Sequence, residues 1–74
     1  DPANPLRHDA VGMLDLQAGR VADAAAHFRN SLRLNPDSAP THYNLGLSLA
    51  LLRRYEEARV ELEAAIARDP AHAQ

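Results

Sequence analysis

Proline recurs along the chain at an interval of 34 residues, at Pro2, Pro36 and Pro70, and each proline follows Asp or Asn. Further identical residues are repeated in the same register, namely Gly12 with Gly46, His8 with His42, Arg20 with Arg54, and Ala24 with Ala58. A fixed period of this length is the signature of stacked structural units, each of which needs a neighbour to cover its apolar face. The chain of 74 residues therefore holds two such units.

Each unit is predicted to form two helices. Ala, Leu, Arg and Glu dominate the composition and β-branched residues are scarce, which favours helix. Asn4 and Ser38 are the expected N-caps, with Pro5 at a first helical position. Pro36 and Pro70 end the second helix of each unit, since proline disfavours a helical residue before it. The predicted helices cover 5–18, 21–34, 39–52 and 55–68, which gives an all-α fold of four antiparallel helices.

The two glycines inside the predicted helices require an explanation, because glycine costs about 1 kcal/mol against alanine there. We expect Gly12 and Gly46 to mark the points where the two helices of a unit approach most closely. Ala24 and Ala58 are the small residues expected opposite them on the second helices.

Composition and charge exclude several classes of function. The chain has no cysteine, so it can form neither a disulfide nor a thiolate metal site. Its net charge of −2 argues against a general nucleic-acid or membrane-surface binder, which is normally basic. No apolar run approaches the roughly 20 residues of a transmembrane helix. We therefore expect neither a nucleic acid nor a membrane as partner.

The repeated segments resemble the tetratricopeptide repeat, a helix–turn–helix unit of 34 residues with a W-x2-L-G-x2-Y…A-x3-F…P pattern. The segment HYNLGLSL (42–49), followed by Ala58, Leu62, Ala65 and Pro70, follows the pattern closely, and HDAVGMLD (8–15) follows it more loosely. Histidine replaces the tryptophan in both units. Asp15 stands at a position that normally packs, and it is expected either to pair with Arg7 or Arg20 or to lie at an exposed edge.

The resemblance implies an α-solenoid of two repeats, over about 5–38 and 39–72, within one domain spanning 1–74. Residues 1–4 and 73–74 are then remnants of flanking repeats, and the chain is expected to be a fragment of a longer protein. The frequent use of Ala, and of Arg in place of Lys, favours a bacterial origin.

By the same resemblance, the first helices line a concave face that binds a peptide segment of a partner protein. The peptide-binding residues carried over by position are Asp9, Met13, Leu16, Tyr43, Asn44, Leu47 and Leu51. Asn44 matches the position at which many members of the family hydrogen-bond the backbone of the ligand. Met13, Leu16, Leu47 and Leu51 have an alternative interpretation as ordinary core between the repeats.

The sequence offers little for catalysis or metal binding. His8 and His42 lie one repeat apart, roughly 10 Å by helix-packing distances, which is too far to share an ion. Ser31 fills a small packing position, Ser38 caps a helix and Ser48 lies inside one, and no phosphate-binding glycine loop is present. We therefore expect no enzyme activity, no cofactor and no metal. The glutamates of the last helix are expected to form a solvated face, or alternatively an acidic docking patch.

Leu62 and Ile66 are expected to face the position of a third repeat, where exposed apolar surface marks an interface. Homodimer formation, a scaffold or spacer role in a larger assembly, and a substrate-presenting arm of an enzyme whose catalytic domain lies elsewhere remain alternatives to peptide binding. The compartment is left open, with the cytoplasm favoured.

Overall fold

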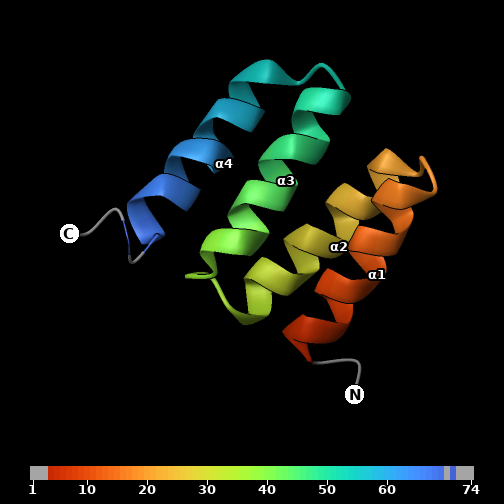
Figure 1. Cartoon of the computed structure of the whole chain (residues 1–74), viewed down its shortest axis with the longest axis horizontal. Helices are drawn as coiled ribbons and strands as arrows, with labels where there is room; N and C mark the ends of the chain where they lie inside the picture. Colours follow the sequence, from red (N-terminus) through yellow and green to blue (C-terminus); the bar gives the residue numbers. More distant parts are fainter. Residues whose placement is uncertain (1–3, 70, 72–74) are drawn as a thin grey trace.

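The computed structural model describes residues 4–69 and 71, and contains four α-helices (Figure 1). These are α1 (Pro5–Gln17), α2 (Val21–Leu34), α3 (Ala39–Leu51) and α4 (Tyr55–Arg68). The described residues form no strand, and the all-α prediction is confirmed. The predicted first and third helices were each one residue too long, because Ala18 and Leu52 form the C-caps.

The predicted starts of α1 and α3 are confirmed by their capping hydrogen bonds. The Asn4 side chain accepts a hydrogen bond from the backbone N–H of Leu6 at 2.9 Å, and the Ser38 hydroxyl accepts one from the N–H of Thr41 at 3.3 Å. These side chains satisfy N–H groups that the first turn of a helix leaves without a partner.

The turns inside the two helical pairs need a left-handed backbone residue, and the two repeats supply different ones. Gly19 has φ +82° in the first turn, and Arg53, its equivalent 34 residues later, has φ +64° in the second. Glycine adopts this conformation without steric cost, whereas an arginine carries a penalty of about 1 kcal/mol. The second turn is therefore the more strained of the two.

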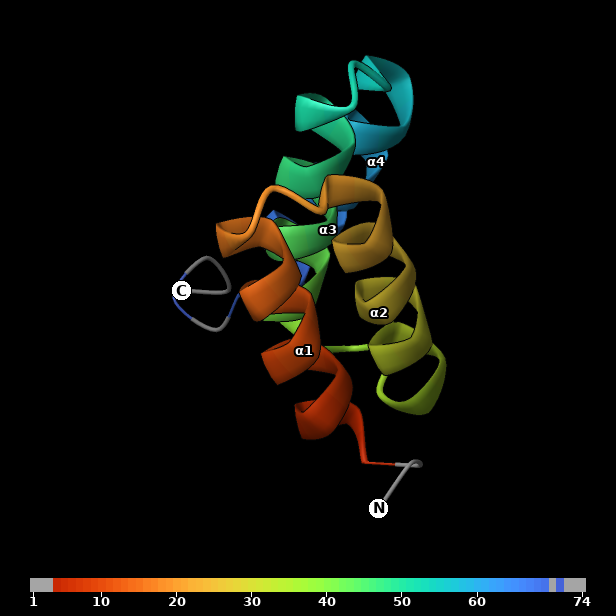
Figure 2. The same cartoon turned by 90° about the vertical axis from the view of Figure 1, so that its right-hand side faces the viewer.

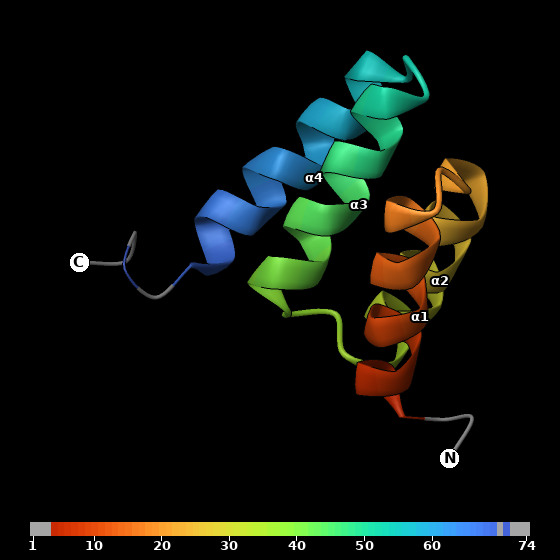
Figure 3. The same ribbon diagram turned by 45° about the vertical axis from the view of Figure 1, so that its right-hand side comes forward.

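The four helices form two antiparallel hairpins that stack side by side. Each helix packs against its neighbour in the sequence, so that α2 contacts both α1 and α3. In Figure 2, α1 and α2 lie side by side and the α3–α4 hairpin stacks against them, with α4 passing behind α3. Figure 3 shows the α3–α4 hairpin lying alongside the α1–α2 hairpin. This arrangement is that of a short α-solenoid.

The core lies around α2 and the inner side of α3. Phe28 is fully buried, together with Ala24 and Ala25 of the same helix and Leu45 and Leu49 of α3. This placement follows from stacking, because α2 is covered by its own hairpin on one side and by the second hairpin on the other.

Both helix-interior glycines lie at points of close approach, as predicted, and Ala58 is among the neighbours of Gly46, but the nearest side chain at each glycine is a larger one. A Cβ atom on Gly12 would lie 2.7 Å from Cε1 of Phe28, so the glycine accommodates the large ring and not the small Ala24. On Gly46 it would lie 2.7 Å from Cγ of Leu62 and 3.2 Å from the carbonyl oxygen of Ala58. Each glycine therefore makes room for the large apolar residue of its partner helix.

Candidate interaction surface

Large apolar side chains lie exposed along α1 and α3. We call the surface formed by Met13, Tyr43, Leu47 and Leu51 the first-helix face. Met13 and Leu47 occupy equivalent positions in the two repeats, and each has 40% of its surface exposed. Tyr43 and Leu51 are more exposed still. Leu16 differs, because it is half-buried and packs against the core cluster.

Asp9 serves a contact between the repeats. Both of its carboxylate oxygens accept a hydrogen bond from the hydroxyl of Thr41, at 3.0 and 3.1 Å. Thr41 is itself buried, and it also contacts the Ser38 hydroxyl at 2.8 Å. A hydrogen bond to a charged group is worth about 1.5–3 kcal/mol, so this contact helps to hold α3 against α1.

Tyr43 and Asn44 line a cavity of about 390 Å³ at the start of α3. Ala65, Ile66 and Asp69, at the end of α4, form much of the remaining wall. Within the described part of the chain, the Asn44 side chain makes no hydrogen bond. The cavity therefore combines an apolar wall with an amide that is available to a ligand.

The two residues predicted for self-association occupy different environments. Leu62 is half-buried against Gly46 of its own hairpin, whereas Ile66 has 54% of its surface exposed and lines the cavity beside Tyr43. The equivalents of Leu62 and Ile66 in the first repeat are Phe28, which is fully buried, and Leu32, which packs against the core.

Asp15 is buried and takes one of the predicted pairings. Its carboxylate accepts a hydrogen bond from Nε of Arg20 at 3.0 Å, and its second oxygen lies 3.7 Å from Nε2 of His27. Nδ1 of His27 in turn lies 3.4 Å from Nδ1 of His8. These contacts explain how an acidic residue is accommodated at a packing position.

His42, Ser31 and Ser48 take structural positions. Nδ1 of His42 lies 2.8 Å from a carboxylate oxygen of Glu61, while His72 lies outside the described residues. Across 4–69 and 71, no three His, Asp or Glu side chains gather in a way that could hold a metal ion. The buried hydroxyls of Ser31 and Ser48 donate to backbone carbonyls, at 3.2 and 2.8 Å.

Sequence reasoning missed the α4 half of the cavity, because it treated α3 as a peptide-binding surface and α4 as an assembly surface. The 34-residue period of the sequence could have indicated this part of the cavity. Ala65 and Asp69 are the equivalents, one period later, of Ser31 and Asn35 at the end of α2. Ser31 contacts the start of α1 through the carbonyl oxygen of Pro5. The ends of second helices therefore lie beside the starts of first helices in both repeats.

No helix in the described ranges 4–69 and 71 is long and apolar enough to cross a membrane.

Comparison with known proteins agrees with this architecture. A family profile described as "Tetratricopeptide repeat" matches residues 12–73, which is most of the chain. A comparison with curated proteins found no match. The matched segment extends from the glycine inside α1 through the whole of α4. The chain, with its two stacked helical hairpins, belongs to the tetratricopeptide repeat family.

Proposed function

We propose that the chain is a protein-interaction module that binds a peptide segment of a partner on the first-helix face, anchored at the cavity beside Tyr43 and Asn44. Repeats of this family generally mediate protein–protein interaction and are typically non-catalytic. The proposal needs no cofactor. The geometry of the cavity supports the more specific part of the proposal, namely that the ligand is a peptide and that Tyr43 and Asn44 anchor it.

The observation that carries the proposal is the combination of an unengaged amide and an apolar wall in one cavity. Asn44 offers both a donor and an acceptor, which can pair with the N–H and C=O of an extended peptide. Tyr43 and Ile66 supply apolar surface for a side chain next to that backbone. Ligand sites commonly have this composition, a mainly apolar wall with a few polar groups that fix orientation.

The expected result of truncating the anchor is a loss of peptide affinity with the fold intact. A displayed library of random peptides is selected on the chain, and the affinity of a selected peptide is measured by calorimetry. Asn44→Ala and Tyr43→Ala are each expected to weaken binding about tenfold, the effect of losing roughly 1.4 kcal/mol. Helical circular dichroism is expected to stay unchanged, because neither residue belongs to the buried core.

Tyr55→Ala is the matched control, since Tyr55 is an exposed tyrosine at the start of α4 that does not line the cavity. Equal losses in Tyr43→Ala and Tyr55→Ala would show that the peptide does not use the cavity. Unfolding of Asn44→Ala would instead assign that residue to the structure of the hairpin.

Self-association is a second candidate function, favoured by the exposure of Ile66. An apolar side chain that remains about half exposed at the edge of a cavity is a usual component of an interface. If a second copy covers it, the mass measured by light scattering rises across a tenfold range of concentration. Ile66→Glu is then expected to return the chain to the monomer, and a wild-type mass that stays monomeric throughout excludes this candidate.

A further inference from the structure

A second groove runs between α2 and α4, with α3 at its base. Two hollows, of about 530 and 200 Å³, share Arg29, Leu45 and Glu61 and so form one continuous feature. We call it the α2–α4 groove. It is separate from the cavity at Tyr43, because none of its lining residues is shared with that cavity.

Regular helical spacing builds the two walls of the α2–α4 groove. The wall from α2 presents Arg29, Leu32 and Arg33, and the wall from α4 presents Glu57, Val60 and Glu61. In both helices these are positions i, i+3 and i+4, which lie on one face. An apolar residue therefore stands between two like charges on each wall, basic on one side and acidic on the other.

The floor of the groove is apolar and comes from α3. Leu45 and Leu49, one helical turn apart, line it and belong to the buried core. The lining on α3 extends from His42 to Leu49. Seven helical steps at 1.5 Å each give the groove a length of about 10 Å, which matches two turns of a helix.

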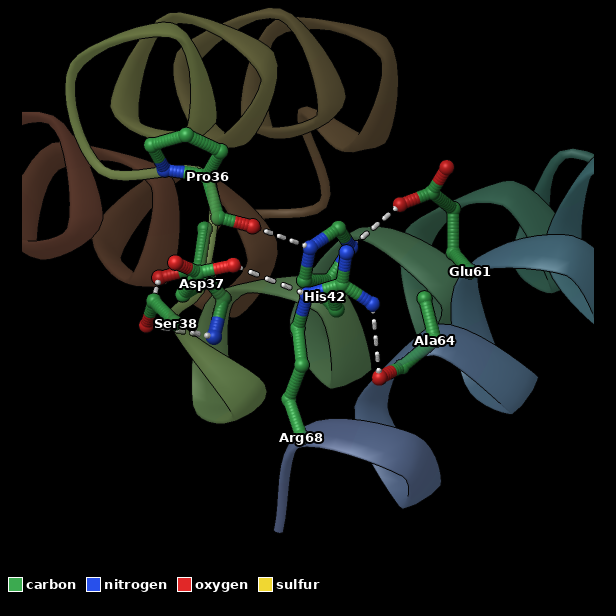
Figure 4. A network of polar contacts seen from close by, with 8 residues as sticks. Pro36, Asp37, Ser38, His42, Glu61, Ala64 and Arg68 are labelled. Atoms are coloured by element: carbon green, nitrogen blue, oxygen red, sulfur yellow. Dashed lines mark hydrogen bonds and ion pairs between the residues drawn. The ribbon is translucent and has the colours of Figure 1, made fainter.

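Both glutamates of the acidic wall already have partners within the chain itself. Figure 4 shows His42 between Glu61 and the carbonyl oxygen of Pro36, with Nδ1 2.8 Å from the Glu61 carboxylate and Nε2 2.8 Å from that carbonyl. Glu57 pairs with Arg54, whose Nε lies 2.6 Å from its carboxylate.

The arginines of the basic wall, in contrast, pair with no carboxylate among the described residues. Among the described residues Arg29 forms no ion pair and no hydrogen bond, although it lines the same hollows as Glu57 and Glu61. Arg33 donates to the side chain of Asn30, which is neutral. The groove therefore carries unbalanced positive charge along one side of an apolar floor.

We propose that the α2–α4 groove binds a short amphipathic segment of another protein, with aliphatic side chains packed between Leu32 and Val60 above the apolar floor and a carboxylate facing Arg29 and Arg33. Grooves between helices receive amphipathic helices through an apolar stripe, and flanking charges fix their orientation. An acidic flank fits because the arginines are the charges that the chain leaves unmatched. This surface lies outside the proposed peptide site and does not depend on it.

The probes for the test are two short synthetic peptides that have the same leucine and alanine positions and carry either glutamate or lysine at the flanking positions. Each is titrated into the whole chain and followed by amide NMR. The glutamate peptide is expected to shift the signals of α2 and α4 around Arg29 and Val60, and to bind more tightly than the lysine peptide.

Arg29→Glu is the deciding variant, because it replaces attraction with repulsion at an exposed side chain that lines both hollows. It is expected to weaken binding of the glutamate peptide about tenfold. Arg7→Glu is the matched control, since Arg7 is an exposed arginine on α1 and lies outside the groove. It is expected to leave the affinity unchanged.

Several outcomes would overturn the proposal. The proposal is wrong if the two peptides bind equally well, or if the glutamate peptide does not bind at millimolar concentration. It is also wrong if Arg29→Glu and Arg7→Glu lose the same affinity, or if the NMR signals that shift are confined to the first-helix face. Light scattering without peptide is a further test. If the Arg29→Glu substitution lowers the mass of the chain to that of a monomer, a second copy of the chain occupies the groove and the proposal is overturned. Failure of the cavity variants at Tyr43 and Asn44 has no bearing on these results.

Discussion

Phe28→Ala is expected to be the most destabilising single substitution in the chain. The ring is fully buried beneath both hairpins, and removing such a side chain costs about 3–5 kcal/mol through lost burial and the cavity left behind. A chain of this size has a total stability of only about 4–11 kcal/mol. Thermal unfolding followed by circular dichroism is expected to show Tm lowered by about 15–30 °C.

Leu62→Ala is the matched comparison, because Leu62 occupies the equivalent position in the second repeat but is only half-buried. It is expected to cost about 1–2 kcal/mol, which is less than the loss in Phe28→Ala. Equal losses of stability in the two variants would mean that the exposed half of Leu62 is covered in solution.

Gly12→Val is expected to be the second most damaging substitution, at about 3 kcal/mol. The new Cβ atom would lie 2.7 Å from Cε1 and 2.9 Å from Cζ of Phe28, and the ring of Phe28 is fully buried. Overpacking of this kind costs 1–3 kcal/mol and at times more, and it outweighs the roughly 1 kcal/mol or less that a helix gains by losing a glycine. Urea titration of the variant against the wild type measures the difference.

The same change at Gly46 separates steric crowding from helix propensity. The nearest atoms there belong to the flexible, half-buried Leu62, with the carbonyl oxygen of Ala58 somewhat farther away. Gly46→Val is therefore expected to cost less than Gly12→Val. Wild-type stability in Gly12→Val would show that α1 and α2 do not cross as closely as described.

The fold was largely predictable because its signals are local and repeated. Capping by Asn4 and Ser38 and the stops before the prolines place the helix ends to within one residue. The errors lie at Ala18 and Leu52, where the periodic pattern continues for one residue after the hydrogen-bonded helix has ended. Of the two turn residues with positive φ, only Gly19 could be recognised from the sequence, because an arginine such as Arg53 has no preference for that conformation.

The candidate sites were less predictable, because they depend on contacts between helices. The family resemblance places Asp9 on the predicted peptide-binding face, but it gives no indication that the Thr41 hydroxyl is hydrogen-bonded to the Asp9 carboxylate. Similarly, the α2–α4 groove requires the relative placement of three helices, which no pattern within one helix specifies. Residue positions therefore followed from the sequence, whereas hydrogen-bond partners and cavities required the structure.

The packing of each helix against its sequence neighbours has a consequence for the folding pathway. Native contacts of this kind close only short loops, so little chain entropy is lost before the first apolar surface is buried. Topologies rich in near-sequence contacts fold in microseconds to milliseconds. Either hairpin can in principle nucleate the chain, and docking through α2 then makes folding of the two halves cooperative.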